Sequence, residues 1–240
     1  MKYLVCYMTL GYPNSDTFLE FIDKSQNLGC DILEIGIPTN NAKYDGPTIK
    51  SSYKKVNKIN IENEFKNLSH IIRKPTLALT YLEDHENDLE NFLKMMKKYN
   101  FAGVLMPDLI IDYIGEYKKY HEFVKRNELN DVIFVSPTVP DKILKEVSEY
   151  SDLFLYYGIR PTTGIPIPIS PDILVKRVRP LVSNKLIVGF GLSNEDINSV
   201  IKAGADGIAI GTAFIKKIDS EGLDSSLNLV KELRGILDET

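Results

Sequence analysis

Two carboxylates lie in the stretch DILEIGIPTNNAKYDGP, which covers residues 31–47. Glu34 interrupts an apolar run, and Asp45 follows in the polar segment after it. A carboxyl group that is removed from water has a raised pKa, which suits it to proton exchange near neutral pH. The residues beside Asp45 are also ordinary turn formers, and Glu34 could instead be paired with an internal lysine or arginine. The pair is therefore a candidate acid–base centre, provided that the fold brings the two segments together.

The position of Glu34 within its apolar run predicts the direction of its side chain. Side chains alternate along a β-strand, so Leu33, Ile35 and Ile37 share one face. Glu34 and Gly36 share the other face. Because an all-aliphatic face is suited to packing on helices, we expect Glu34 to point to the inside of a sheet that carries helices on its outside.

Short apolar runs of this kind recur along the chain, with helix-like segments between them. They are rich in Ile, Val, Leu and Tyr, too short for most helices, and typical of buried parallel strands. The eight runs cover residues 3–9, 31–37, 76–82, 102–108, 132–138, 153–159, 186–192 and 207–213. Eight βα units without a break in composition predict one α/β domain over residues 1–240, a closed (β/α)8 TIM barrel, which typically has roughly 250 residues. An open doubly wound sheet is the alternative, although it would more often carry a GxGxxG or Walker loop after its first strand.

The segment 15–29 illustrates the helices expected between these runs. Ser15 or Asp16 can cap its start, its apolar residues have helical spacing, and Gly29 can end it. A helix of this length is enough to cross from one parallel strand to the next.

Glycine-rich turns follow the last two runs. VGFGLS covers residues 188–193 and AIGTAF covers residues 209–214, each just before a helix-like segment. Backbone amides without side chains in the way, next to helix N-termini, form anion sites, and barrels of this kind often bind phosphate at these two loops. The sequence therefore predicts a phosphate-bearing ligand, with RPTTGIP at residues 160–166 as a third wall.

The overall charge excludes several kinds of partner. The chain is 43% hydrophobic and 26% charged, and its formal net charge of −4 gives no positive field for nucleic acid or anionic lipid. We expect the lysine pairs at 54–55, 97–98 and 118–119 to be solvated helix faces. No run has membrane-spanning length and no signal peptide is evident, so a cytoplasmic location is expected.

The cysteines and histidines do not form a recognisable reactive or metal-binding pattern. Cys6 and Cys30 lie in or beside apolar runs, where a thiol usually behaves as a small buried hydrophobe. His70, His85 and His121 stand apart, without Cys, Asp or Glu at ligand spacing across strand ends. No metal site is therefore expected, and no nucleophile motif indicates covalent catalysis.

The motifs, taken in order, resemble the α subunit of tryptophan synthase. The resemblance covers nearly the whole chain and rests on YMTLGYP, DILEIGIP followed by YDGPTI, TLALTY, GVLMPDL, VSPTVPD, TTG, VGFGLS and ADGIAIGTAFIK. The spacing of LEIGIP and DGP is its most specific part, because the glycine loops are shared with many phosphate-binding barrels. The resemblance implies a lyase that cleaves indole-3-glycerol phosphate to indole and glyceraldehyde 3-phosphate, without a metal or organic cofactor.

The resemblance also implies roles for particular residues. Glu34 matches the catalytic glutamate, which would pass a proton to carbon 3 of the indole ring. Asp45 matches the catalytic aspartate, which would accept a hydrogen bond from the indole N–H. Tyr7 and Tyr81 would line the indole pocket, and Thr163 would belong to a mobile loop. The residues that would hold the phosphate are Gly164, Gly189, Gly191, Gly211 and Thr212.

The resemblance implies a tryptophan synthase β subunit as partner, and the chain departs from the family at a contact loop. After GIP the family usually reads Phe-Ser-Asp-Pro, whereas residues 39–42 here are TNNA. A non-standard or transient complex is therefore one expectation. Asp108 matches a family position near the partner-facing mouth, and it fits equally well as a strand-end cap. The chain also starts at its first strand, without the helix that usually precedes it in the family.

Two other functions stay open on the sequence alone. One is another phosphate-binding barrel enzyme, such as an isomerase or epimerase of a phosphosugar. The other is a non-catalytic or weakly active α-type module that regulates a pyridoxal-phosphate β subunit, which the altered loop at residues 39–42 motivates.

Overall fold

A computed structural model of the protein describes residues 1–159, 169–189 and 191–240. Its strands form one parallel sheet in the order β5-β4-β3-β2-β1-β9-β8-β7-β6. The strands are β1 (Tyr3–Thr9), β2 (Ile32–Gly36), β3 (Thr76–Leu79), β4 (Gly103–Leu105), β5 (Asn130–Val132), β6 (Phe134–Val135), β7 (Leu155–Gly158), β8 (Leu186–Gly189) and β9 (Gly207–Ile210). Each lies in or beside one of the eight predicted runs.

The sheet closes into a barrel whose fifth strand is interrupted. β5 pairs with β4 and β6 pairs with β7, and in the chain only Ile133 separates the two short strands. The Ile133 amide donates to the Ser151 hydroxyl at 2.9 Å, which takes it out of the strand ladder. β5 and β6 therefore fill the place of the single strand predicted over residues 132–138. The (β/α)8 barrel is confirmed, and the open doubly wound sheet was the wrong alternative.

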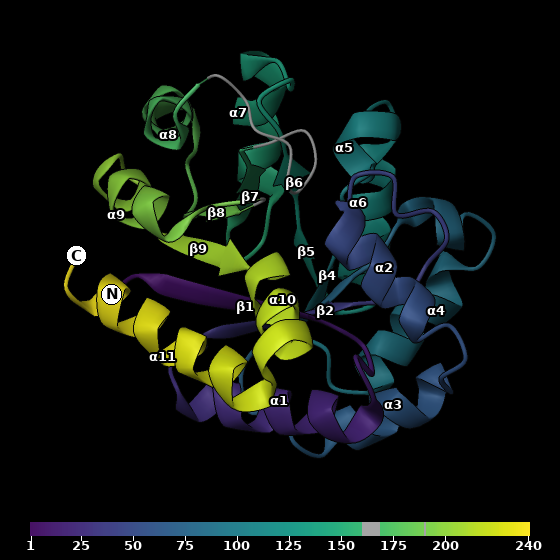
Figure 1. The fold of residues 1–240 in the computed structure, drawn as a ribbon. Helices are drawn as coiled ribbons and strands as arrows, with labels where there is room; N and C mark the ends of the chain where they lie inside the picture. Colours follow the sequence, from purple (N-terminus) through teal and green to yellow (C-terminus); the bar gives the residue numbers. More distant parts are fainter. Residues whose placement is uncertain (160–168, 190) are drawn as a thin grey trace.

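Helices surround the strands on the outside (Figure 1). The α-helices are α1 (Ser15–Asn27), α2 (Pro47–Lys55), α3 (Ile61–Ser69), α4 (Leu89–Lys98), α5 (Leu109–Asp112), α6 (Tyr117–Arg126), α7 (Asp141–Tyr150), α8 (Pro171–Val178), α9 (Asn194–Lys202), α10 (Thr212–Glu221) and α11 (Leu223–Asp238). Among the described residues, the 3-10 helices η1 (Leu82–His85) and η2 (Arg179–Leu181) follow β3 and α8. This arrangement leaves the C-terminal ends of the strands, and the loops that follow them, for function.

Local sequence sets the bounds of α1. Its cap is Asn14 rather than the predicted Ser15 or Asp16, because the Asn14 side chain accepts a hydrogen bond from the Thr17 amide at 3.0 Å. The predicted end is confirmed at Gly29, whose φ of 113° lies in the left-handed region that glycine adopts without a steric penalty.

β1 is the first element that the structure describes, and the last helix, α11, packs beside it. Arg234 on α11 donates one hydrogen bond to the Lys2 carbonyl at 3.0 Å and another to Asp31 at 3.0 Å. The two ends of the chain lie on the same side of the molecule (Figure 1).

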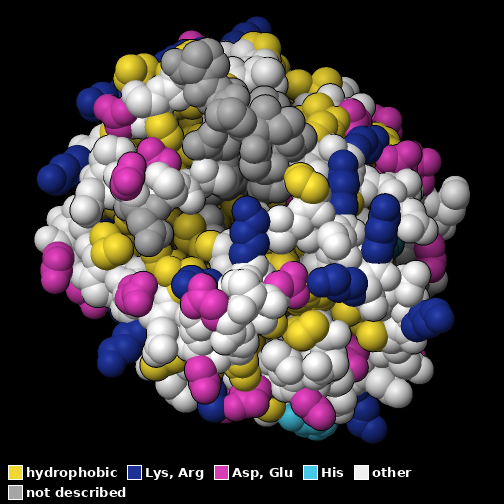
Figure 2. All heavy atoms as spheres, viewed as in Figure 1, with side chains coloured by type: hydrophobic (Ala, Val, Ile, Leu, Met, Phe, Trp, Pro, Cys, Tyr) yellow, Lys and Arg dark blue, Asp and Glu magenta, His cyan; other side chains and the backbone are white. Residues whose placement is uncertain are grey.

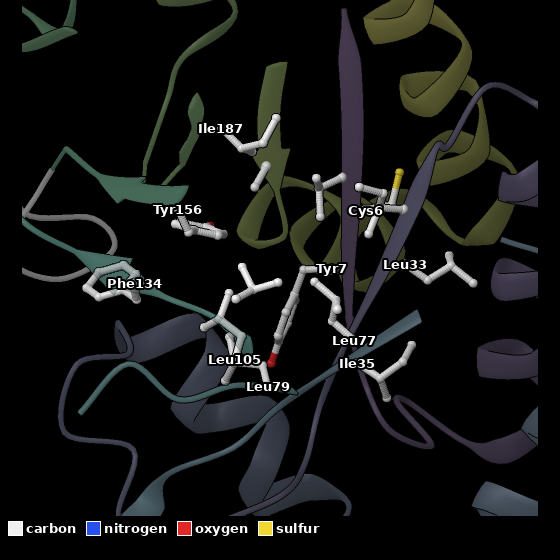
Figure 3. Packing of buried hydrophobic residues seen from close by; sticks show 14 of the residues in the cluster. Cys6, Tyr7, Leu33, Ile35, Leu77, Leu79, Leu105, Phe134, Tyr156 and Ile187 are labelled. Carbon is white, nitrogen blue, oxygen red and sulfur yellow. The ribbon is translucent and has the colours of Figure 1, made fainter. Parts of the chain in front are cut away.

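The alternation predicted for the second run is seen in β2. Leu33 and Ile35 have no exposed surface and point to one side of the strand, whereas Tyr7 of β1 points into the space between the strands (Figure 3). Cys6 and Cys30 are both free and buried, which confirms their prediction as small hydrophobes. The barrel interior is thus lined by the residues of opposite parity to the helix-facing aliphatics.

Charged side chains of both signs are mixed over the face shown in Figure 2. Within the lysine pairs, Lys98 forms an ion pair with Glu62 at 3.0 Å and Lys118 with Glu146 at 2.6 Å, on exposed helix faces, as predicted. Over the three described ranges, no helix combines the length and apolar character needed to cross a membrane.

Candidate active site

A cavity opens at the C-terminal ends of the strands, where the chemistry of a barrel is expected. It contains about 510 Å³ of empty space, part of which is open to solvent. Several residues predicted for the site line this cavity, namely Tyr7, Glu34, Asp45, Gly191, Gly211 and Thr212. Segments from β1, β2, β9 and the loop after β8 therefore meet at one place.

Glu34 lies in the wall of this cavity with 1% of its surface exposed. The strand register places it beside Tyr7 of β1 and Leu77 of β3. Burial, followed by the negative charge of Asp45, raises the pKa of Glu34 from 4.5 to about 8. No described lysine or arginine forms an ion pair with it, so the internal ion pair is not seen in this part of the chain. A pKa of about 8 means that Glu34 is mainly protonated at pH 7.

Asp45 lies in the loop between β2 and α2 and is also buried, with 4% of its surface exposed. The Tyr81 hydroxyl donates a hydrogen bond to it at 2.9 Å. Burial raises the pKa of Asp45 from 3.8 to about 6, against the lowering effects of Tyr81, of the Lys50 charge and of the Tyr53 hydroxyl. Near pH 7 the cavity therefore holds one protonated and one ionised carboxyl group, a division typical of acid–base sites.

Tyr7 and Tyr81, which the resemblance assigned to the indole pocket, occupy different positions. Tyr7 lines the cavity. Tyr81 has no exposed surface and contacts the site through its hydrogen bond to Asp45. Its oxygen also accepts a hydrogen bond from the Tyr44 amide at 3.2 Å, and the two rings stack with centroids 6.4 Å apart. Tyr81 thus acts in the structure as a support for Asp45.

Glycines make room for the tyrosine rings of the cavity. A Cβ atom at Gly211 would lie 2.7 Å from the Tyr7 ring, and one at Gly36 would lie 2.1 Å from the Tyr7 hydroxyl oxygen. At Gly189 a Cβ atom would lie 2.2 Å from the hydroxyl oxygen of Tyr156. Gly189 therefore serves the site by admitting Tyr156, because real Cβ atoms do not approach other atoms this closely.

The loop after β9 has the features of an anion site. Gly211 precedes α10, whose first residues, Thr212 and Ala213, line the cavity. The Thr212 hydroxyl oxygen is buried, and no described residue forms a hydrogen bond with it. A helix N-terminus and an unpartnered hydroxyl together suit a phosphate group. Thr163 and Gly164 lie outside the described residues.

Tyr156 and Tyr53 belong to the site, although sequence reasoning did not select them. Tyr156 of β7 lines the cavity opposite Tyr7 (Figure 3). The alternation of side chains along β7 could have indicated that a tyrosine points into the barrel. Because Tyr156 and Tyr157 are adjacent and point to opposite faces, the sequence alone did not show which of the two it is. Tyr53 on α2 contacts the Tyr7 hydroxyl at 3.1 Å, and no sequence motif indicated it.

Asp108 at the same end of the barrel has a structural contact. Its two oxygens accept hydrogen bonds from the Leu82 and Glu83 amides at 2.9 and 3.1 Å, so it caps η1, and it has no exposed surface. The structure therefore gives Asp108 a capping role, but towards the helix after β3 rather than the end of its own strand β4, and its match to the partner-facing mouth stays a prediction. Within the described part of the chain, no three His, Cys, Asp or Glu side chains are grouped so that they could hold a metal ion.

Comparisons with known proteins give one consistent family. The family model described as "Tryptophan synthase alpha chain" matches residues 1–237. The tryptophan synthase alpha chain of Saccharolobus solfataricus is 54% identical over 239 residues, which cover 99% of this chain and 98% of that protein. The alpha chain of Sulfurisphaera tokodaii is 51% identical over 242 residues, with 99% and 98% coverage.

Solved structures show the same fold. A mutant tryptophan synthase alpha-subunit from Pyrococcus furiosus superimposes with a TM-score of 0.84 at 26% identity, covering 99% of this chain and 100% of that one. A chain from the tryptophan synthase α2β2 complex of the same organism gives a TM-score of 0.82 at 26% identity, with both chains covered completely.

Proposed function

The chain belongs to the tryptophan synthase alpha chain family, and we infer from this that it is a lyase of tryptophan biosynthesis. Its reaction is the retro-aldol cleavage of indole-3-glycerol phosphate to indole and glyceraldehyde 3-phosphate. The observation that carries the proposed mechanism is the pair of buried carboxyl groups at one cavity, with pKa values of about 8 for Glu34 and about 6 for Asp45.

Glu34 is proposed as the proton shuttle. The bond between indole carbon 3 and the side chain breaks only after carbon 3 has been protonated, because the ring can then accept the bonding electron pair. A protonated Glu34 donates that proton, and the resulting carboxylate removes the proton of the adjacent side-chain hydroxyl as the aldehyde forms. Glu34 ends the cycle protonated, so protons balance. General acid–base assistance of this kind contributes roughly 10²- to 10⁴-fold.

Asp45 is proposed as the group that stabilises charge on the ring. When carbon 3 is protonated, positive charge develops at the indole nitrogen. An ionised carboxylate can accept a hydrogen bond from the N–H, and this bond becomes stronger as the positive charge grows. Because the bond is stronger in the transition state than in the bound substrate, it lowers the barrier to cleavage. The hydrogen bond from Tyr81 and the nearby Lys50 charge favour the ionised form of Asp45.

The two roles need opposite protonation states at the same time. Below a pH of about 6 Asp45 gains a proton, and above a pH of about 8 Glu34 loses one. The fully competent site is therefore restricted to the interval between these values.

The phosphate is proposed to lie at the loops after β8 and β9. The backbone of Gly191 and Gly211, the N-terminus of α10 and the Thr212 hydroxyl support this placement. Gly189 contributes by making room for Tyr156, and Thr163 and Gly164 remain proposed contacts from the sequence resemblance. With the phosphate bound at this position, the indole ring of the substrate would point towards Glu34 and Asp45.

Family membership favours the lyase over the two alternative functions. A phosphosugar isomerase or epimerase acts on a substrate without an indole ring, so it would not require a carboxylate such as Asp45 to accept a hydrogen bond from a ring N–H. A non-catalytic module would not need to keep two carboxyl groups buried beside one cavity at the free energy that desolvation costs. Both carboxyl groups are retained here, with their pKa values separated.

A tryptophan synthase β subunit is the partner that the family implies, since the Pyrococcus relative forms an α2β2 complex. The loop at residues 39–42, where the chain departs from Phe-Ser-Asp-Pro, lies at the same end as the cavity. Its Asn40 and Asn41 are exposed, and the side-chain amide of Asn41 donates a hydrogen bond to Asp84 at 2.6 Å. We propose that this polar, tethered loop makes the contact with the β subunit non-standard or transient.

Incubating the purified chain with indole-3-glycerol phosphate tests the proposed activity. Indole and glyceraldehyde 3-phosphate are expected in equal amounts, quantified by chromatography with and without a β subunit. A phosphosugar with no indole ring should not react. If neither the chain alone nor the complex released indole, the lyase assignment would be wrong.

Replacing Thr212 with valine is expected to weaken substrate binding without destabilising the fold. A hydrogen bond to a charged group is worth about 1.5–3 kcal/mol, so KM should rise by about 10- to 100-fold. The melting temperature should not fall, because no described residue uses the Thr212 hydroxyl. Thr76→Val is the matched control: it removes a 3.0 Å bond to the Lys74 carbonyl, far from the cavity, and should lower stability while KM stays unchanged. An unchanged KM in Thr212→Val would remove Thr212 from the phosphate site.

A further inference from the structure

The aspartate proposed for catalysis closes a tight turn after β2. The Asp45 amide donates a hydrogen bond to the Ala42 carbonyl at 3.2 Å, which leaves Lys43 and Tyr44 as the two central residues of the turn. Lys43 is exposed and Tyr44 is half-buried, whereas Asp45 is buried. In a turn of four residues, the direction of the last side chain depends on the backbone of the two central residues. Contacts that fix Lys43 and Tyr44 therefore also affect the position of Asp45.

One carboxylate from another loop binds both central residues of the turn. Asp112 is the last residue of α5, which follows β4, and one of its oxygens accepts a hydrogen bond from the Tyr44 hydroxyl at 2.8 Å. Its other oxygen forms an ion pair with the Lys43 ammonium group at 2.9 Å. Lys43 forms a second ion pair, at 2.8 Å, with Glu83 on η1. The turn is thus held by the segments that follow β3 and β4.

The two acidic partners are themselves fixed by a buried residue. Asp108 has no exposed surface, and its carboxylate accepts a hydrogen bond from the Glu83 amide at 3.1 Å. Its carbonyl accepts a hydrogen bond from the Asp112 amide at 2.8 Å. The backbone of both partners is therefore tied to the same buried residue, which makes Asp112 and Glu83 a firm support for the turn.

Tyr44 connects this support to Asp45 by a second route. Its amide donates a hydrogen bond to the Tyr81 hydroxyl oxygen at 3.2 Å, and the two rings stack. The Tyr81 hydroxyl keeps its own proton for Asp45, to which it donates at 2.9 Å. The position of the Tyr81 oxygen, and with it the direction of its bond to Asp45, therefore depends on Tyr44.

We propose that Asp112 is a positioning residue: it holds the turn at residues 42–45 so that the carboxylate of Asp45 faces the cavity. This inference rests on the role of Asp45 in the proposed function. An exposed ion pair usually adds little to stability, so the main effect of these contacts is on geometry. A catalytic group has to be held close to its productive position, because a small displacement lowers the rate many-fold.

The variant Asp112→Ala tests the proposal through indole release at pH 7. Because the turn loses both of its contacts to α5, kcat should fall by about 10-fold, while KM and the melting temperature change little. Asp112→Asn keeps an oxygen for the Tyr44 hydroxyl but loses the charge that pairs with Lys43, so its kcat should lie between those of wild type and Asp112→Ala. An unchanged kcat in Asp112→Ala would overturn the proposal.

Glu86→Ala is the matched control for Asp112→Ala. Glu86 is also an exposed carboxylate, it follows η1 directly, and it accepts a hydrogen bond from the Tyr113 hydroxyl. Its removal should leave kcat unchanged, because it does not contact the turn that carries Asp45.

A double-mutant cycle separates positioning from a general effect on the fold. In the Asp45→Asn background, the group that Asp112 positions has lost its charge, so adding Asp112→Ala should lower kcat by less than about 2-fold. A merely structural role of Asp112 would lower kcat by the same factor in both backgrounds, and that result would contradict the proposal.

Tyr44→Phe removes the hydrogen bond to Asp112 without changing any charge. The ring can still stack on Tyr81, but the turn is held less firmly, so the bond from Tyr81 to Asp45 should weaken. Because this bond favours the ionised carboxylate, the acid limb of the pH dependence of kcat should move to higher pH. Tyr113→Phe is the control: it removes another tyrosine hydroxyl at this end of the barrel and should leave the acid limb in place. An unshifted acid limb in Tyr44→Phe would contradict the route through Tyr81.

The outcomes separate this inference from the function beneath it. Full activity in both Glu34→Gln and Asp45→Asn would contradict the proposed function. Loss of activity in Asp45→Asn together with a wild-type kcat in Asp112→Ala would contradict only the role of Asp112.

Discussion

Replacing Glu34 with glutamine will reduce the rate of indole release by about 10²- to 10⁴-fold, the range for loss of a general acid–base group. Glutamine keeps the size of the side chain but can neither donate a carboxyl proton to carbon 3 nor remove the proton of the substrate hydroxyl. Single-turnover measurements on enzyme saturated with indole-3-glycerol phosphate give this rate directly. Glu64→Gln is the control, because Glu64 is also buried but accepts its hydrogen bond from Ser15 outside the barrel. Similar rates in wild type and Glu34→Gln would disprove the role of Glu34.

The same variant should be more stable than wild type at neutral pH. The pKa of Glu34 is raised in the folded state, so its contribution to stability is complete below its usual pKa of 4.5 and is lost as pH rises towards about 8. Glutamine carries no such cost. At about 1.4 kcal/mol per pH unit above 4.5, the advantage of the variant is on the order of 3 kcal/mol at pH 7. Urea unfolding between pH 5 and 8 would show the advantage growing with pH, whereas a constant difference would contradict burial as the cause of the shift.

Replacing Asp45 with asparagine should reduce turnover by about 10²- to 10³-fold, comparable to loss of one preorganised electrostatic contact. The amide oxygen can still accept from the indole N–H, but it carries no negative charge to meet the positive charge on the ring. The pH dependence should change at both ends. The acid limb should disappear, and the basic limb should move below a pH of about 8, because the charge of Asp45 helps to raise the pKa of Glu34.

Asp84→Asn is a suitable control for this second variant. Asp84 is an exposed carboxylate at the same end of the barrel, where it accepts from Asn41. Its replacement should leave both limbs of the pH profile unchanged. If Asp45→Asn kept the acid limb of the wild type, that limb would belong to another group.

The direction of Glu34 could be predicted because the backbone of a strand imposes a period of two on its side chains. Because Leu33 and Ile35 face the surrounding helices, the side chain of Glu34 between them must point into the barrel interior. The interruption of the fifth strand could not be found in this way. It depends on the Ser151 hydroxyl, which comes from 18 residues further along the chain and accepts a hydrogen bond from the Ile133 amide.

The tyrosines show where sequence reasoning about the site ends. The family resemblance assigns both Tyr7 and Tyr81 to the indole pocket. In the structure Tyr7 lines the cavity, whereas Tyr81 is fully buried behind Asp45. Tyr53 carries no motif, and its contact with Tyr7 arises only when α2 folds against the barrel. The roles of Thr163 and Gly164 stay predictions.

The central claim is that Glu34 is protonated while Asp45 is ionised during catalysis, and the pH dependence of kcat/KM for indole release tests it most directly. The profile should be bell-shaped, rising near pH 6 as Asp45 ionises and falling near pH 8 as Glu34 loses its proton. A rate that continues to rise above pH 8 would mean that ionised Glu34 is the active form, and it would contradict the account.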